Sequence, residues 1–388
     1  MNIKMKIGVM TIVKVNNYGA ELQAFATQRK LSLMGYDAEI VDYRYYKSWN
    51  FKDSKMSAPL LPMSIKGKIG YWVKYRLINA IVEKVLPLFS RCVKNRIARF
   101  ESFHKKNTKF SCLYASMDDL YSNPPKYDVY MTGSDQVWNP VASSSIEPYF
   151  LTFAPKDKKK VSYASSFGVR SIDELIKSKI GKWLKDYVCI SVRENSGLDL
   201  VKNLSGKDAT WVVDPTLLLS KHEWLDVAEP YPDMPSKYVL IYQLFESESI
   251  ERLAKKIGDE KGIPVYRICK RAIGEKRTDG ITNILDAGPA EFLSLIANAE
   301  YVVTNSFHGT AFSINFGIPF FTVVSSRKKN NSRIESLLGL VGLKNRIVLD
   351  NELIDRIDLT SSIDYENVHN LLNSQRKISE DFIREAIC

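Results

Sequence analysis

The chain has 388 residues, of which 45% are hydrophobic and 26% charged, a balance that fits a soluble globular protein of two domains. It contains no apolar run of the roughly 18–20 residues that a membrane-spanning helix needs, and no secretory signal is expected at its N-terminus. Five scattered cysteines without a CxxC pair argue against a zinc site and a disulfide framework, and they favour a reducing compartment.

The first forty residues predict a β-α-β unit. The continuous apolar run over residues 7–13 is typical of a buried parallel strand, and residues 20–34 carry an apolar stripe of helical period. Gly35 ends that helix, and residues 38–43 form the next strand. Such a unit predicts a parallel sheet with helices on both faces.

A basic helical segment follows over residues 51–110. Apolar residues recur there at steps of mostly three and four, with a break or kink expected near Pro87. The segment holds 14 Lys or Arg against three acids, a balance equal to the net charge of +11 of the whole chain. An apolar stripe with Trp72 and Phe89 beside a Lys/Arg face is the composition of an interfacial helix. Two interpretations follow. One is peripheral contact with the inner membrane surface; the other is that the stripe packs on the first domain, as amphipathic helices of globular proteins usually do, with the basic face solvated or facing a partner subunit.

Alternating strand and helix patterns resume after this segment. Strands are expected over 127–132, 160–165, 189–193 and 210–213, and a helix over 173–187. Residues 229–236 contain three prolines and form the expected linker. Residues 1–228 then make an N-terminal domain that includes the 51–110 insertion.

A second α/β set fills residues 237–365, and residues 366–388 form a C-terminal helix. Strands are expected over 238–244, 265–269, 301–304 and 320–324, with helices over 248–262, 289–299 and 308–316. The expected fold class is α/β, with two Rossmann-like parallel-sheet domains facing a central cleft, as in the GT-B architecture. Because fold alone does not fix chemistry, function must be argued from sites.

The strongest candidate site lies where the strand 301–304 passes into the helix 308–316. Asn305, Ser306, His308 and Gly309 occupy this junction. The positive dipole end of a helix and its N–H groups bind anions, which suits a phosphorylated ligand. His308 is suited to protonate carbon or oxygen near neutral pH; the alternative is a histidine that only caps the turn.

Two further polar side chains follow predicted strands. Arg193 offers a guanidinium that grips a carboxylate or phosphate with two hydrogen bonds, the alternative being an ion pair with Glu194 or another acid. Asp135 is placed to take a proton from a sugar hydroxyl or to hold it. The alternative there is an Asx-turn, with Trp138 in the core rather than stacked on a sugar ring.

Five segments resemble polysaccharide pyruvyl transferases, in the order of that family. They are NYGAELQ at 17–23, GSDQVWN at 133–139, SVRE at 191–194, DPT at 214–216 and the segment around His308. The resemblance implies a GT-B-like fold, phosphoenolpyruvate as donor, and a pyruvyl ketal on a cell-surface glycan as product. Carried over onto matching positions, it makes Arg193 and His308 donor-site residues.

One departure from the family concerns the charge around the donor. Members often carry Arg two positions before the histidine, where this chain has Ser306. Positive charge for the trianionic donor is then expected from the basic run after the strand 320–324, above all from Lys328 and Arg333. The alternative is that this run is a solvated loop.

The expected site therefore has three groups of residues. His308 and Asp135 are the expected catalytic residues. The expected donor-binding residues are Arg193, Asn305, Ser306, His308, Gly309, Lys328 and Arg333. The expected acceptor-binding residues are Asn17, Tyr18, Ser134, Asp135 and Gln136, of which the first two are equally suited to be plain turn formers.

The expected reaction moves a pyruvyl group from phosphoenolpyruvate to a sugar of a polysaccharide or of its lipid-linked precursor. His308 protonates the vinyl carbon, two sugar hydroxyls attack in turn, and phosphate leaves. No metal, no cofactor besides this co-substrate and no nucleic-acid partner are expected, in a cytoplasmic enzyme peripheral to the inner membrane face. The alternatives are a nucleotide-sugar-dependent GT-B glycosyltransferase and a non-catalytic glycan- or anion-binding protein.

Overall fold

The computed structural model describes the chain except for residues 1–3, 54–60, 62, 141–145 and 328–330. The chain divides into two compact units. Unit 1 comprises Met1–Leu86, His104–Leu218 and Gln375–Cys388, and unit 2 comprises Pro87–Phe103 and Leu219–Ser374. The division thus falls after Leu218, ahead of the linker expected at 229–236, and both the basic segment and the C-terminal helix contribute to both units.

Two arginines account for the place of Pro87–Phe103 in unit 2. Arg96 is buried and donates from Nη1 to the carbonyl of Cys269 and from Nη2 to that of Lys270, each at 3.1 Å. Arg99 donates to the carbonyl of Asp286 at 2.9 Å and pairs with Glu291 at 2.9 Å. The basic charge of this stretch is therefore partly used to satisfy carbonyls and acids of unit 2, which the charge count alone does not reveal.

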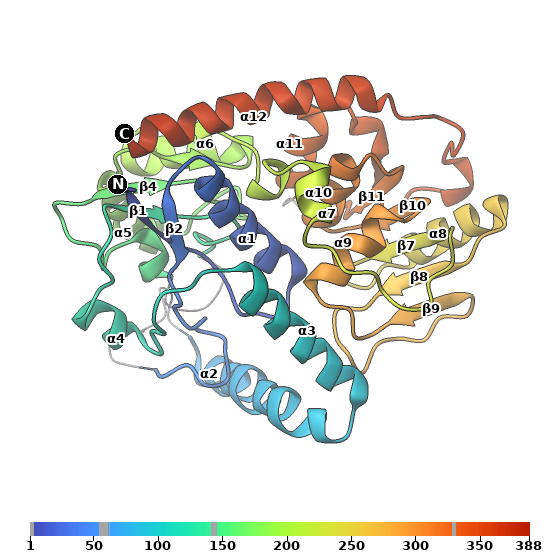
Figure 1. Ribbon diagram of the computed structural model, residues 1–388, viewed down its shortest axis with the longest axis horizontal. Coiled ribbons are helices and arrows are strands. Elements are labelled where there is room, and N and C mark those ends of the chain that lie inside the picture. Colours follow the sequence, from blue (N-terminus) through green and yellow to red (C-terminus); the bar gives the residue numbers. More distant parts are fainter. Residues whose placement is uncertain (1–3, 54–60, 62, 141–145, 328–330) are drawn as a thin grey trace. The chain divides into compact units, whose positions relative to one another are not determined.

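Unit 1 is built on a parallel sheet (Figure 1). Its strands, in spatial order, are β2 (Asp37–Ile40), β1 (Lys6–Met10), β3 (Val129–Thr132) and β4 (Lys159–Ser162). A further parallel pair is formed by β5 (Ser191–Val192) and β6 (Thr210–Trp211). The helices of unit 1 include α1 (Tyr18–Leu33), α4 (Met117–Ser122), α5 (Glu174–Lys185) and α6 (Asn195–Ser205). The strand order reverses direction between β1 and β3, so the topological switch point of this sheet lies there.

Unit 2 carries a parallel sheet of six strands. In spatial order they are β12 (Ile347–Leu349), β11 (Phe320–Val324), β10 (Tyr301–Thr304), β7 (Val239–Tyr242), β8 (Val265–Ile268) and β9 (Ile281–Ile284). Its helices include α7 (Lys221–Leu225), α8 (Glu248–Lys261), α9 (Pro289–Ala297), α10 (Phe307–Phe316) and α11 (Ser332–Leu340). The switch point lies between β7 and β10. The C-terminal helix α12 (Tyr365–Ile387) begins in unit 2 and ends in unit 1.

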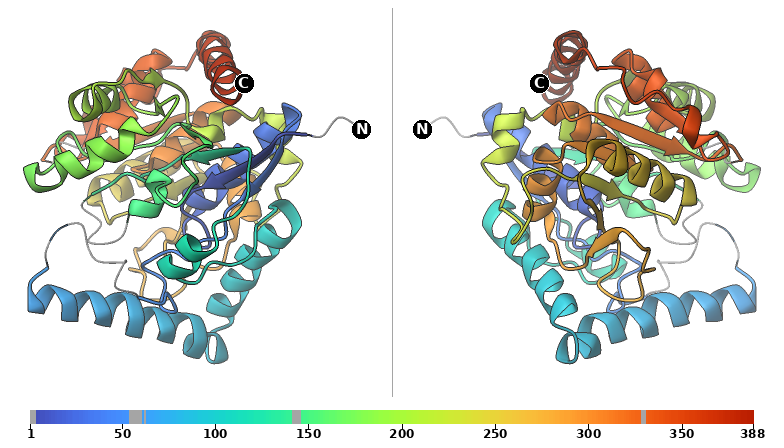
Figure 2. Two further views of the ribbon diagram at one scale, coloured as in Figure 1. Left: turned by 90° about the vertical axis from the view of Figure 1, so that its left-hand side faces the viewer. Right: turned by 90° about the vertical axis from the view of Figure 1, so that its right-hand side faces the viewer.

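The expected helical segment forms one long rod followed by α3 (Arg91–Asn107) (Figure 2). The rod consists of α2 (Ile65–Trp72), π-helical turns at Val73–Ile78 and Ile81–Val85, and a 3₁₀ turn at Leu86–Leu88. The break expected near Pro87 is confirmed, because the 3₁₀ turn and the start of α3 lie there. The packing of the apolar stripe on the first domain is not observed, since most of its side chains are exposed.

Each unit has its own apolar core, and Trp138 belongs to that of unit 1. Its side chain is fully buried, stacks on Phe150 at 5.4 Å between ring centroids and donates from Nε1 to the carbonyl of Tyr149. Trp138 is therefore a core residue and not a sugar-stacking platform. Among the described helices none has the length and hydropathy required to cross a bilayer.

Candidate active site

The predicted acceptor-binding residues follow the two strands that flank the switch point of unit 1. Asn17 and Tyr18 come after β1, and Ser134, Asp135 and Gln136 come after β3. Ligands of open parallel sheets bind outside the carboxyl ends of the strands at such a point. The strand order thus brings together two segments that lie more than a hundred residues apart in the sequence.

Asn17 and Tyr18 shape the start of α1. Asn17 is the N-cap, and its Oδ1 accepts hydrogen bonds from the backbone N–H groups of Gly19 at 3.0 Å and Ala20 at 3.3 Å. The side chain of Tyr18 is buried. Asn17 therefore forms the turn, which was the alternative to substrate binding. It also follows β1, at the sheet edge where the acceptor is expected to bind.

The loop after β3 has a backbone that few residues adopt. Gly133 has φ = +113° and Asp135 has φ = +66°, the left-handed region that favours Gly and Asn or Asp. A Cβ on Gly133 would lie 2.1 Å from the carbonyl oxygen of Tyr163, so only glycine fits there. The GSDQ sequence is thus explained by the turn that it makes at the sheet edge.

Side chains from other predicted segments hold this loop. The N–H of Ser134 donates to Oε1 of Gln23 at 3.0 Å, and Nε2 of Gln23 donates to Oγ1 of Thr11 at 2.8 Å. The Oγ of Ser134 lies 3.0 Å from Oδ2 of Asp214. Gln136 makes a local contact, because its Oε1 accepts from Nδ2 of Asn139 at 2.7 Å. Gln23 and Asp214 belong to the family-like segments 17–23 and 214–216 but are not among the predicted site residues.

Arg193 is the centre of a buried ionic cluster. Its guanidinium donates from Nη2 to Oδ1 of Asp135 and from Nη1 to Oδ2 of Asp214, each at 2.8 Å, and lies 4.0 Å from Glu194. Burial acts to lower the pKa of Arg193, but the carboxylates of Asp135, Asp214 and Glu194 outweigh it and raise that pKa. Arg193 therefore forms the ion pair that was the alternative to donor binding.

Asp135 is the member of this cluster that reaches solvent. Its side chain is 14% exposed, whereas the side chains of Arg193 and Asp214 are fully buried. Asp214 is further fixed by the N–H and Oγ1 of Thr216, which donate to its Oδ1 at 3.0 and 2.8 Å. The arrangement presents one carboxylate at the sheet edge and secures it from behind with a permanent cation.

The predicted site residues of unit 2 also follow a strand beside the switch point. Thr304 ends β10, Ser306 is the N-cap of α10, and His308 lies in the first turn of that helix. The Oγ of Ser306 accepts from the N–H of Gly309 at 3.3 Å. A Cβ on Gly309 would lie 2.4 Å from Oγ1 of Thr304, which explains why glycine occupies this position.

Asn305 ties β10 to the chain that leaves the neighbouring strand. Its Oδ1 accepts from the N–H of Leu244 at 2.7 Å, and its Nδ2 donates to the carbonyl of Phe245 at 2.9 Å. Both ends of the amide are thus bound to backbone after β7. This contact makes Asn305 a positioning residue for the loop at the switch point.

His308 and Gln243 are two further buried polar side chains near the ends of β10 and β7. His308 is 7% exposed and lies edge-on to the ring of Phe307, with 5.3 Å between ring centroids. Gln243 follows β7, is also 7% exposed, and its Oε1 has no hydrogen-bond partner among the described residues. Sequence reasoning missed Gln243, although its position directly after a strand of the switch point could have indicated it.

The basic run expected to supply positive charge is only partly described. Lys328 lies outside the described residues. Arg333 is half-buried in the first turn of α11, which packs against α10. Arg333 is thus on a helix adjacent to the one that carries His308.

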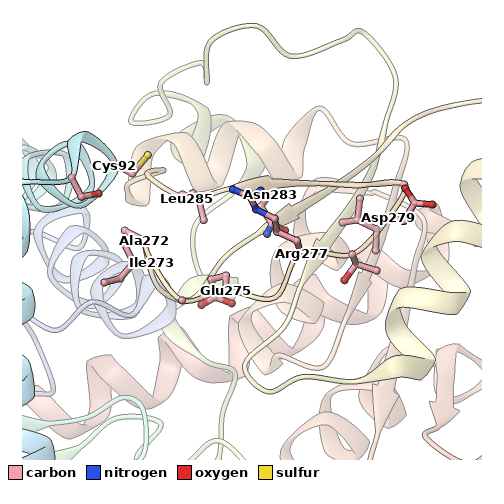
Figure 3. A pocket seen from close by; sticks show the side chains of 13 residues that line it. Cys92, Ala272, Ile273, Glu275, Arg277, Asp279, Asn283 and Leu285 are labelled. Atoms are coloured by element: carbon pink, nitrogen blue, oxygen red, sulfur yellow. The ribbon is translucent and has the colours of Figure 1, made fainter.

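A separate cavity of about 760 Å³ lies elsewhere in unit 2 (Figure 3). Cys92, Ala272, Glu275 and Asn283 are among its lining residues, and none of its lining residues belongs to the predicted site. Within the described residues there is no group of three or more His, Cys, Asp or Glu that could hold a metal ion. The cavity is therefore separate from both His308 and Asp135, the two predicted catalytic residues.

Comparisons with known proteins address the family and the fold. The model of a family described as polysaccharide pyruvyl transferase matches residues 17–327. Among solved structures, trehalose-6-phosphate from E. coli bound with UDP-2-fluoro glucose is similar at 11% identity and a TM-score of 0.50, over 98% of this chain and 99% of that one. UDP-GlcNAc 2-epimerase of Methanocaldococcus jannaschii, with UDP-GlcNAc and UDP, is similar at 15% identity and a TM-score of 0.46, over 98% and 99% of the two chains. No curated protein matches the sequence. The fold is GT-B-like α/β, with parallel sheets and a C-terminal helix.

Proposed function

The chain belongs to the polysaccharide pyruvyl transferase family, and from this premise we propose that it transfers a pyruvyl group from phosphoenolpyruvate to a sugar of a cell-surface polysaccharide or its lipid-linked precursor. The product is a pyruvate ketal, and inorganic phosphate is released. The cytoplasm is the proposed compartment. The observation that carries the proposal is that family segments follow the strands at the switch point of each sheet.

The proposed reaction consumes two sugar hydroxyls and one molecule of phosphoenolpyruvate. Protonation of the vinyl methylene turns it into a methyl group and leaves an oxocarbenium-like centre at the adjacent carbon. One hydroxyl oxygen bonds to that carbon, the carbon–oxygen bond to phosphate breaks, and the second hydroxyl closes the ketal. Of the two hydroxyl protons lost, one is balanced by the new methyl group and the other leaves with phosphate.

The residues of unit 2 are the proposed donor side. His308 is the proposed general acid, since an imidazole titrates near neutral pH and this one lies in the first turn of α10. The positive end of the α10 dipole favours a phosphate or carboxylate at the same place. Arg333 and Lys328 are the proposed sources of positive charge, with Asn305 and Ser306 fixing the shape of the edge.

The residues of unit 1 are the proposed acceptor side. Asp135 is the proposed general base for a sugar hydroxyl, because it is the partly exposed carboxylate at the sheet edge. Arg193 is reinterpreted as a positioning residue for Asp135, since its guanidinium is fully buried and paired. Asn17, Tyr18, Ser134 and Gln136 shape the surface on which the acceptor is proposed to lie.

The test is incubation of the purified chain with phosphoenolpyruvate and a panel of synthetic and lipid-linked glycans. The expected result is phosphate release together with a mass gain of one pyruvate less one water on the acceptor. Parallel titrations with nucleoside diphosphates address the glycosyltransferase alternative. Tight nucleoside diphosphate binding without phosphoenolpyruvate binding would contradict the proposal. Absence of phosphate release with every acceptor in the panel, while phosphoenolpyruvate still binds, would support the non-catalytic binding protein.

A further inference from the structure

The rod of residues 65–85 in unit 1 has two rows of side chains, each with a repeat of four residues. The outer row is apolar and consists of Ile65, Ile69, Val73, Leu77, Ile81 and Val85. The inner row is offset by two positions and consists of Gly67, Tyr71, Tyr75, Asn79 and Glu83. An offset of two residues places the rows on opposite sides of a helix.

The outer row is straight because part of the rod is wound more widely than an α-helix. A step of four residues exceeds the 3.6 residues of an α-helical turn, so an apolar row with this repeat would drift around a regular α-helix. The π-helical turns at Val73–Ile78 and Ile81–Val85 have wider i→i+5 hydrogen bonding, which reduces the drift. Sequence repeat and helix winding thus agree in producing one continuous apolar face.

The inner row binds the rod to the rest of unit 1. The Oη of Tyr71 donates to the carbonyl of Tyr46 at 3.0 Å, and Nδ2 of Asn79 donates to that of Lys47 at 3.2 Å. Oε2 of Glu83 accepts from Nε1 of Trp49 at 2.7 Å. The polar face of this amphipathic rod is therefore the one turned toward the protein.

Arg76 reinforces the same orientation. Its Nη1 donates to the carbonyls of Tyr46 and Ser48, and its Nη2 pairs with Asp53 at 2.9 Å. These contacts bind a cation that lies between the two rows to residues 46–53. A rotation of the rod that buried the outer row would break them, so the outward position of the apolar row is held by specific hydrogen bonds.

The outer row is left to solvent. Its side chains are 37–78% exposed, and Trp72 beside it is 56% exposed. An amphipathic helix of a globular protein usually buries its apolar face, so a contiguous apolar row of this length indicates an interaction surface. Packing of the stripe on the first domain would require the apolar row to face the protein, whereas here the row faces solvent.

The charges beside the outer row indicate what covers it. Lys66, Lys68, Lys74 and Lys84 are exposed and lie between the two rows. A second copy of the chain would bring the same four lysines against them, which costs electrostatic free energy. Anionic lipid headgroups complement these cations, and tryptophan and lysine are the side chains favoured at the boundary between headgroups and acyl chains.

We propose that residues 65–85 dock unit 1 on an anionic lipid bilayer, with the outer row in the interface and the four lysines among the headgroups. The rod lies in the plane of the membrane, as interfacial amphipathic helices do. The proposal is independent of the transferase reaction, and its test needs no substrate.

The experiment is co-sedimentation of the full chain with phosphatidylcholine vesicles that contain or lack phosphatidylglycerol. The wild-type chain is expected to sediment with the anionic vesicles at low salt and to be released at high salt. Each cation near an anionic surface strengthens binding by about fivefold, so replacing all four lysines by Gln should weaken binding at least about 100-fold. Failure of the wild-type chain to sediment with anionic vesicles at low salt would overturn the proposal.

Two further variants separate insertion of the apolar row from attraction of charge alone. The row variant Ile69→Gln, Leu77→Gln and Ile81→Gln keeps every charge and uses a good helix former. Its matched control, Leu175→Gln with Val188→Gln, removes exposed apolar side chains from another part of unit 1. Loss of vesicle binding in the row variant alone is expected; equal binding by both would overturn insertion of the row.

A charge control and a size measurement complete the test. Lys156, Lys158, Lys182 and Lys185 are exposed lysines elsewhere in unit 1, and their replacement by Gln should leave vesicle binding near the wild-type value. Sedimentation equilibrium without lipid is expected to give the same single molecular mass for the wild type and the row variant. A dimer that the row variant abolishes would assign the outer row to a second copy and overturn the membrane proposal.

Discussion

Nη2 of Arg193 lies 2.8 Å from Oδ1 of Asp135, and the arginine is fully buried whereas the aspartate reaches solvent. The cation thus stands behind the carboxylate, on the side away from water. Such a pair orients the carboxylate, while the fully buried guanidinium itself offers no exposed surface to a ligand. Three carboxylates surround this one cation, so removing it leaves negative charge buried without compensation.

Replacement of Arg193 should therefore act on stability and turnover more than on donor binding. Arg193→Ala is expected to lower the free energy of unfolding by about 3–5 kcal/mol. Arg193→Lys should lower it by less, because lysine keeps the charge but lacks the planar guanidinium that donates to two carboxylates at once. In Arg193→Lys, kcat should fall while calorimetric affinity for phosphoenolpyruvate stays near the wild-type value. A loss of phosphoenolpyruvate affinity at unchanged stability would instead support the donor-binding role first predicted for Arg193.

Asp135→Asn should abolish most of the turnover and leave the loop intact. Asparagine tolerates the left-handed backbone at this position, φ = +66°, and keeps the shape of the side chain. Loss of a general base is expected to lower kcat at least ~100-fold, measured as phosphate release. Asp208→Asn, at an exposed acid of the same unit, is the control and should be active. Turnover within a few-fold of the wild type in Asp135→Asn would remove this carboxylate from the chemistry.

His308→Gln tests the general acid with little change in buried volume. The imidazole is buried in the first turn of α10, so glutamine is preferable to alanine for keeping the helix end packed. The expected result is a loss of at least ~100-fold in transfer with an unfolding temperature close to that of the wild type. His222→Gln, at an exposed histidine of the same unit, should retain full activity. Near-normal transfer by His308→Gln would show that the histidine only caps the turn.

Strand ends and their polar residues could be predicted from the sequence, because a buried apolar run followed by Gly, Asn or Asp marks the carboxyl edge of a parallel sheet. The edge strands β9 and β12 were not predicted. β9 carries exposed Thr282 and the partly exposed Asn283, so it lacks the continuous apolar run of a central strand. Its strand character depends on pairing with β8 rather than on its own composition.

Contacts between distant segments could not be predicted from the same patterns. The motif residues Gln23, Ser134 and Asp214 were noticed separately, but their hydrogen bonds join positions 80 and 111 residues apart. The orientation of the rod 65–85 was likewise open, because periodicity fixes which residues share a face and not which face meets the protein. That choice is made by the carbonyls of residues 46–48, which accept from Tyr71, Arg76 and Asn79, and by Asp53, which pairs with Arg76.

Gln243 provides a test of whether the edge at β7 and β10 is built for a ligand. Its buried Oε1 has no hydrogen-bond partner among the described residues, and such a group costs about 1–3 kcal/mol of desolvation. Gln243→Met, which removes the polar group at similar volume, should therefore raise the free energy of unfolding. The same change should weaken phosphoenolpyruvate binding, since a polar group kept at such a cost is explained by a ligand that satisfies it.

The control for this prediction is Asn305→Ala, at the neighbouring strand end. Asn305 has both ends of its amide bound to backbone, to the N–H of Leu244 and the carbonyl of Phe245. Its removal should lower the unfolding temperature and the affinity together, because the loop after β7 loses its attachment. Gln243→Met should separate the two quantities, with a higher unfolding temperature in thermal melts and a lower affinity in calorimetry. If Gln243→Met instead destabilises the chain and leaves affinity for phosphoenolpyruvate unchanged, the amide is a structural element of the core and the donor is bound elsewhere.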